Sequence, residues 1–184
     1  FANSGAEANE CAVKLARKYG RDFLGSGCTE IVTLKNSFHG RTVTTLAATG
    51  QDEFHACFTP LTSGFSYAEP NMESVKSAVT EKTCAVLLEL IQGEGGVVPM
   101  PEPFVKELRA FCTEKKILLM VDEVQTGVGR TGAFYCYQNY GILPDVVTSA
   151  KGIASGLPLG ACLCAEPFAN VLGPGTHGST FGGN

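Results

Sequence analysis

Short apolar runs of strand length alternate with amphipathic stretches along this 184-residue chain, and this alternation constrains the fold more than any other feature. Residues 84–91 form such a run, broken only by Glu89, and residues 117–121 form a second. A strand that is apolar on both faces is typical of a parallel sheet covered by helices on each side. Further strands are expected over residues 30–34, 146–149 and 161–165. We therefore predict an α/β fold, with a mostly parallel sheet flanked by helices.

Helix signals fill the gaps between these strands. Ser4 is suited to an N-cap and Glu7 follows three residues later, which is the pattern of a capping box. The first helix is expected to begin here and to end at Gly20. Other helices are expected over residues 42–49, 71–79 and 103–115. Residues 60–70 are expected to form an irregular loop between two of these elements.

The composition excludes several classes of function. A formal net charge of −4 provides neither a basic surface for nucleic acid nor a polybasic patch for a membrane. No apolar stretch approaches the ~18 residues of a transmembrane helix. The eight cysteines form no C-x-x-C pair, which favours reduced cysteines in a cytoplasmic protein. Charged residues make up 17% of the chain, below the usual ~25%, so part of its surface is expected to be covered by other protein.

Two nucleotide-binding patterns are incomplete. Residues 117–123 have the form of a Walker B strand, but no glycine-rich loop with its phosphate-binding lysine accompanies it. Residues 127–132 match G-x-G-x-x-G, yet four residues separate this motif from the end of the preceding strand, where a dinucleotide fold would begin it. His39, His55 and His177 show no ligand spacing, so no metal is expected.

Polar residues at the ends of helices and strands are the candidates for chemistry, because ligands of parallel sheets bind beyond the carboxyl ends of the strands. Ser4, Gly5 and Ala6 begin a helix, where free N–H groups can bind phosphate, although an ordinary cap would have the same sequence. Asp122 follows five apolar residues and needs a partner for its charge. Lys151 follows a strand among small residues, a position where a lone lysine is usually a solvated loop residue.

Together, these three features match the needs of pyridoxal phosphate. This cofactor requires an amine for its aldehyde, a carboxylate for its ring nitrogen and an anion site for its phosphate. The lysine amine, once displaced by substrate, can act as the base that moves the α-proton.

An ordered set of motifs adds a family resemblance. The motifs occupy residues 3–10, 38–42, 89–96, 122–127, 149–152 and 177–180. This set closely resembles the class III, ornithine/acetylornithine-type aminotransferases of pyridoxal-phosphate fold type I, and it covers essentially the whole chain. Within the family, residues 14–17 and 48–51 are most similar to the acetylornithine-type branch.

The resemblance implies a role for each matched residue. Lys151 would bond the cofactor, Asp122 would pair with its ring nitrogen, and Gln125 would approach its ring hydroxyl. Phe38 would stack on the ring. The implied cofactor-binding residues are Ser4, Gly5, Ala6, Phe38, Asp122, Val124, Gln125, Lys151 and, toward the neighbouring subunit of a homodimer, Thr180.

The resemblance also implies substrate contacts. Arg41 would hold a substrate carboxylate, Ser179 would lie near the substrate, and Glu94 would be the glutamate that neutralises an arginine when an amine-bearing substrate binds. Other interpretations remain open: Phe38 as a core residue, Arg41 as a surface ion pair, Glu94 as a loop acid and Thr180 as a turn residue. No role is implied for Glu89 or His39.

The implied reaction transfers an amino group from an acetylornithine-like terminal-amine donor to 2-oxoglutarate, in arginine biosynthesis. Alternatives are an ornithine or 4-aminobutyrate aminotransferase, an aminomutase, decarboxylase or racemase, or an inactive cofactor-binding fragment. Members of the family are about twice as long, so residues 1–184 are expected to be an incomplete large domain, without an N-terminal segment and a C-terminal small domain. Such a chain is expected to have little activity alone. Leu90 departs from the family, where many relatives have proline.

Overall fold

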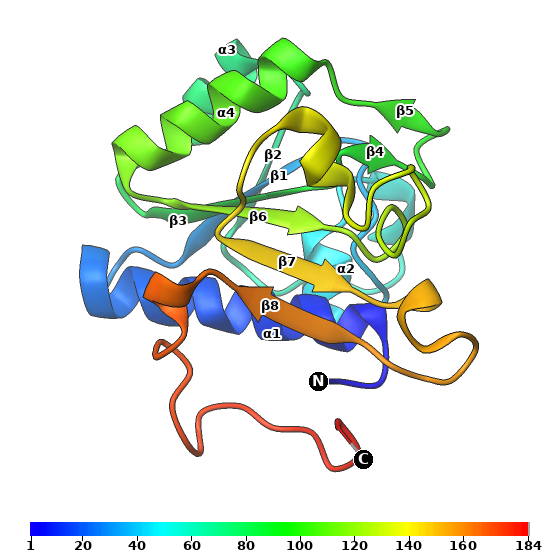
Figure 1. Cartoon of the computed structure of the whole chain (residues 1–184). Coiled ribbons are helices and arrows are strands. Elements are labelled where there is room, and N and C mark those ends of the chain that lie inside the picture. The colour runs from blue at the N-terminus through cyan, green and yellow to red at the C-terminus, as the bar shows by residue number, and fades with distance from the viewer. Residues whose placement is uncertain (184) are drawn as a thin grey trace.

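A six-stranded sheet runs through the centre of the computed structural model, which describes residues 1–183 (Figure 1). In spatial order, its strands are β2 (Phe65–Ala68), β1 (Glu30–Leu34), β3 (Thr83–Leu88), β6 (Leu118–Asp122), β7 (Val146–Ser149) and β8 (Ala161–Cys164). The first five strands are parallel to one another, and β8 is antiparallel to β7 at one edge. The prediction of a mostly parallel sheet is therefore confirmed.

Helices cover both faces of this sheet. The α-helices are α1 (Gly5–Tyr19), α2 (Val43–Ala48), α3 (Met72–Ala78) and α4 (Glu102–Lys115). Figure 1 shows α3 and α4 on one side of the sheet and α1 on the other. No helix within residues 1–183 has both the length and the apolar character needed to cross a membrane.

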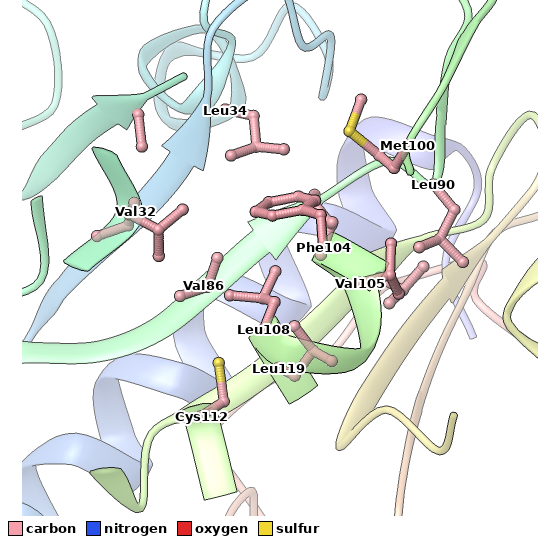
Figure 2. Packing of buried hydrophobic residues seen from close by; sticks show 14 of the residues in the cluster. Val32, Leu34, Val86, Leu90, Met100, Phe104, Val105, Leu108, Cys112 and Leu119 are labelled. Atoms are coloured by element: carbon pink, nitrogen blue, oxygen red, sulfur yellow. The ribbon is translucent and has the colours of Figure 1, made fainter. Parts of the chain in front are cut away.

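Two apolar cores hold these layers together. Figure 2 shows Phe104 and Leu108 of α4 packing beside Val86 of β3 and Leu119 of β6. On the opposite face, alternate residues of the same strands pack against α1. All residues of β3 and β6 are buried, as their uninterrupted apolar runs predict. The sheet is thus a rigid support for groups at its edge.

Short elements complete the chain. A two-stranded antiparallel ribbon pairs β4 (Ile91–Gln92) with β5 (Val98–Pro99). A π-helical turn, η1 (Gly20–Leu24), continues α1. Short 3₁₀ helices are η2 (Asp52–Phe54), η3 (Cys136–Tyr140), η4 (Lys151–Ala154) and η5 (Glu166–Phe168).

Two strand expectations are wrong in detail. Residues 60–70 are not an irregular loop, because β2 forms within them and pairs with β1 along one edge of the sheet. This strand is stabilised by its pairing with β1, which the local sequence, with its prolines and glycine, does not indicate. The run 84–91 is not one strand: β3 ends at Leu88, and the buried carboxylate of Glu89 then accepts the N–H groups of Phe38 and Gly93.

The ends of α1 also differ from expectation. Ser4 caps the helix, since its hydroxyl accepts the N–H of Glu7 at 3.2 Å, but the Glu7 carboxylate accepts the N–H of Asn3 instead of that of Ser4. Gly20 does not end the helical path, because it keeps a right-handed conformation and leads into η1. It is needed there because a Cβ atom would lie 1.9 Å from the carbonyl oxygen of Cys28.

Candidate active site

A pocket lies beside the carboxyl ends of β3 and β6 and the N-terminus of α1. Most of the residues that sequence analysis singled out for cofactor binding meet here. Its lining consists of Gly5, Ala6, Asn9, Phe38, His39, Gly40, Glu89, Glu94, Asp122, Val124, Gln125 and Lys151. The sheet topology brings these residues together, because the loops that follow parallel strands all lie at the same edge of the sheet.

The carboxylate of Asp122 lies at the end of β6 and is only 4% exposed. Its Oδ2 atom accepts from Asn9 Nδ2 and from His39 Nδ1, each at 2.8 Å. Its Oδ1 atom accepts the N–H of Val124 at 3.0 Å. Three donors from three segments therefore fix this buried acid in one orientation.

The next residue, Glu123, holds the loop behind the pocket. It is fully buried and accepts the N–H of Tyr137 at 2.8 Å and the hydroxyl of Thr126. Burial raises the pKa of this carboxyl above its ordinary value. Because Glu123 ties residues 124–126 to η3, it restrains the segment that carries Val124 and Gln125.

Lys151 follows β7 and contributes its amine to the same pocket. Its backbone is left-handed, with φ of 47°, and its side chain is exposed. The amine donates a hydrogen bond to Oε1 of Gln125. The predicted amine and the predicted carboxylate thus line one pocket from neighbouring strands.

The N-terminus of α1 provides the third predicted feature. Gly5 and Ala6 line the pocket, and the first N–H groups of an α-helix have no carbonyl partner within the helix. Gly5 allows a close approach, because a Cβ atom there would lie 2.7 Å from Cγ1 of Val124. Ser4 is not among the lining residues, and its hydroxyl is engaged by the cap on Glu7.

The two predicted substrate residues near this pocket differ in position. Glu94 lines the pocket with an exposed side chain. Arg41 does not line it, and its guanidinium lies over the ring of Phe54, at 4.8 Å from the centroid, and at 5.7 Å from that of Phe38. Phe38 itself lines the pocket, and its N–H donates to Glu89.

Ser179 and Thr180 are not brought into the pocket that contains Lys151. They line a separate hollow beside the start of α1. The Ser179 hydroxyl accepts from Nδ2 of Asn3 at 3.1 Å and from the N–H of Gly182 at 3.0 Å. Their predicted contacts with a neighbouring subunit remain a prediction.

Sequence analysis assigned no role to three buried polar residues of the pocket: Asn9, His39 and Glu89. Burial raises the pKa of Glu89 to about 7, the charge of Asp122 adds to this effect, and His39 opposes it. A signal for Asn9 was present in the sequence. Asn9 precedes Ala12, Val13 and Ala16 by three, four and seven residues, so it occupies the core-facing side of α1.

Comparisons with known proteins identify the family of this chain. Residues 1–184 match the family described as aminotransferase class-III. The chain belongs to this family. It is 55% identical to the acetylornithine aminotransferase of Oceanobacillus iheyensis over 185 residues, which cover 100% of this chain and 46% of that protein.

Two further proteins show lower identity to this chain. The chain is 49% identical to the succinylornithine transaminase of Salmonella paratyphi B, covering 100% of this chain and 45% of that protein. The crystal structure of ornithine aminotransferase from Toxoplasma gondii matches with a TM-score of 0.93 at 34% identity, covering 99% of this chain and 44% of that one. This class III chain therefore spans about half the length of the curated relatives it matches.

Proposed function

We propose that this class III chain is the pyridoxal-phosphate-binding large domain of an aminotransferase. In this proposal, the enzyme transfers an amino group from an acetylornithine-like terminal-amine donor to 2-oxoglutarate, in arginine biosynthesis. One observation carries the proposal: the amine of Lys151, the carboxylate of Asp122 and the start of α1 line a single pocket. The names of the similar proteins, acetylornithine aminotransferase among them, support the choice of donor.

The residues of the pocket fit this cofactor. A carboxylate oxygen offers two acceptor sites. Oδ2 of Asp122 receives two donors, whereas Oδ1 receives one, so one acceptor site remains for a protonated ring nitrogen. The free N–H groups at the start of α1 suit a phosphate, and the amine of Lys151 suits an aldehyde. When bound, pyridoxal phosphate takes up electrons from the carbon that carries the transferred amino group.

In this proposal, four residues of the pocket have separate roles. Asp122 keeps a negative charge at the ring nitrogen, because its donors hold it in place. Lys151 Nζ is the group placed to take a proton from the reacting carbon and return it. Gln125 receives a hydrogen bond from this amine and so retains it at the pocket. Phe38 contributes an apolar wall that limits access of water.

Substrate recognition is assigned to the exposed residues. The planar guanidinium of Arg41 can bind a carboxylate through two parallel hydrogen bonds. Glu94 forms no ion pair within residues 1–183, so its carboxylate is available to a guanidinium or to the amine of a donor. These roles would let one site accept an amine-bearing donor and a dicarboxylic acceptor in turn.

The proposal includes a cytoplasmic homodimer in which Thr180 reaches the phosphate of the neighbouring subunit and Ser179 lies near its substrate. Phe1 and Phe181 are exposed aromatic side chains, and the segments that carry them meet where Gly182 approaches the carbonyl of Phe1. An apolar area of this kind supports a covered interface. The eight unpaired cysteines support a reducing compartment.

Covalent labelling tests the cofactor site directly. The purified chain is incubated with pyridoxal phosphate, reduced with borohydride, digested and examined by mass spectrometry. We expect the phosphopyridoxyl group on Lys151, and its loss in Lys151→Ala, with Lys82→Ala as the matched control that keeps the label. Because Lys151 is exposed, its replacement should leave the fold intact. A label on Lys35 or Lys82 instead would refute the site.

Turnover tests the donor. Acetylornithine, succinylornithine, ornithine and 4-aminobutyrate are compared as donors by following glutamate formation from 2-oxoglutarate. The assay uses residues 1–184 and the longest reading frame that contains them, at equal cofactor occupancy. We expect acetylornithine to be preferred by the longer protein and little turnover by residues 1–184 alone. Preference for 4-aminobutyrate would contradict the proposed donor.

A further inference from the structure

One buried amide connects the parts of the pocket. Asn9 lies on α1, one turn beyond Gly5, and is only 1% exposed. Its Nδ2 donates to Oδ2 of Asp122 at 2.8 Å and to the carbonyl oxygen of His39 at 2.8 Å. Its Oδ1 accepts the hydroxyl hydrogen of Thr148 at 2.7 Å.

The orientation of this amide is fixed by its partners. A side-chain NH₂ group has two hydrogens, and Asn9 directs them at two oxygens that can only accept. Reversal of the amide would place Oδ1 against both acceptors, which is unfavourable in a buried site. The Thr148 hydroxyl supplies the matching donor to Oδ1. Every polar atom of the Asn9 side chain is therefore satisfied in only one arrangement.

Thr148 extends the connection to the strand that precedes Lys151. It lies on β7 directly beside Asp122 of β6, and its own carbonyl accepts the N–H of Glu123 at 2.9 Å. Its side chain is 1% exposed, so its hydroxyl cannot exchange its partner for bulk water. Asn9 thus links three elements of the proposed cofactor site. These are α1, whose start is proposed to bind the phosphate, β6, which ends at Asp122, and β7, which precedes Lys151.

We propose that Asn9, held by Thr148, is a positioning residue that fixes the Asp122 carboxylate so that its one free acceptor site faces the ring nitrogen of the cofactor. The inference rests on the proposed function, because it acts through Asp122. It predicts that Asn9 contributes to affinity only for a ligand that has a protonated ring nitrogen. A residue that merely supports the fold would contribute equally to any ligand of the same shape.

A pair of ligands separates these possibilities. Binding of pyridoxal phosphate and of its deaza analogue, in which a C–H group replaces the ring nitrogen, is measured by fluorescence titration of the cofactor-free chain. Asn9→Ala should weaken binding of pyridoxal phosphate by about tenfold, since it removes a hydrogen bond to a charged group. Its affinity for the deaza analogue should change by less than about twofold.

Two threonine variants provide a milder test and its control. Thr148→Val removes only the hydroxyl that orients Asn9 and should show the same selective loss, by about threefold. Thr33→Val is the matched control: Thr33 is a buried threonine of β1 whose hydroxyl has no partner within residues 1–183. It should leave both affinities unchanged. Should Asn9→Ala fail to fold, which thermal unfolding would reveal, Thr148→Val decides the question alone.

Equal losses for both ligands in Asn9→Ala and Thr148→Val would overturn the positioning role. Asp122→Asn tests the premise with the same two ligands. If Asp122→Asn distinguishes them while the Asn9 and Thr148 variants do not, only the inference on Asn9 is wrong. If Asp122→Asn does not distinguish them, the proposed role of Asp122 fails, and the role of Asn9 fails with it.

Discussion

The residues proposed to contact the cofactor and those proposed to contact the substrate are held in different ways. Asp122, Asn9 and His39 are buried and hold one another through hydrogen bonds of 2.8 Å. Arg41 and Glu94 are exposed side chains on loops. Arg41 stacks on Phe54, and Glu94 has no ion-pair partner within residues 1–183.

This contrast separates side chains that are held in one conformation from side chains that are free to change partners. Removal of one partner from a buried hydrogen bond costs free energy, because the other partner is left unsatisfied. Asp122, Asn9 and His39 are therefore held in one arrangement. Exposed side chains lose little free energy when they change partners, so the proposed substrate contacts of Arg41 and Glu94 are compatible with more than one substrate. We expect substitutions in the first group to lower stability or cofactor affinity clearly, and substitutions in the second to change both only slightly.

The largest expected effect concerns the pH dependence of stability. The pKa of Glu89 is raised by burial from an ordinary 4.5 to about 7, so between these values the folded chain retains a proton that the unfolded chain has released. Stability should therefore fall as the pH rises through this window and level off above pH 7. The loss should be about 3 kcal/mol, from about 1.4 kcal/mol per pKa unit.

Glu89→Gln tests this expectation, since an amide has no such titration. Urea unfolding of the cofactor-free chain at several pH values should show that the variant lacks this decline. Glu94→Gln is the control, an exposed carboxyl of the same pocket, and should stay within about 0.5 kcal/mol of wild type throughout. Parallel pH profiles for wild type and Glu89→Gln would show that Glu89 is not protonated in the folded chain.

A smaller effect is expected at the start of α1. In Gly5→Ala, the new Cβ atom would lie 2.7 Å from Cγ1 of Val124, and the stiff side chain of Val124 must move. We expect about tenfold weaker binding of pyridoxal phosphate, which corresponds to about 1.4 kcal/mol. Fluorescence titration measures it. Gly27→Ala is the control, because no atom lies within 4 Å of its added Cβ. An unchanged affinity in Gly5→Ala would show that the close approach of Gly5 to Val124 does not contribute to cofactor binding.

The smallest effect is expected at Arg41. Arg41→Ala removes an exposed cation–π contact and should lower the free energy of unfolding by no more than about 1 kcal/mol. Affinity for pyridoxal phosphate should change by less than about twofold. Thermal unfolding and titration measure both, with exposed Arg21→Ala as the control. A large loss of cofactor affinity would place Arg41 among the cofactor-facing residues and erase the contrast.

The local sequence predicts much of this arrangement. The apolar runs predict β3, β6 and β7, because a strand that is buried on both faces consists almost entirely of apolar residues. The same runs place Asp122 and Lys151 at strand ends. The edge strand β2 escapes prediction because it is only half-buried, and its stability comes from pairing with β1 instead of from its own residues.

The sequence by itself determined the fold class and the family, and it supplied the residues proposed to bear the chemistry. The tertiary structure alone decided their partners. Asn9 meets Asp122 across 113 residues of chain, and Thr148 meets Asn9 across 139. A hydrogen bond requires the donor–acceptor distance to be correct within a few tenths of an ångström and the donor to point at the acceptor. Residue type and spacing set which groups can donate and accept, but only the packing of α1 against the sheet brings these particular groups together.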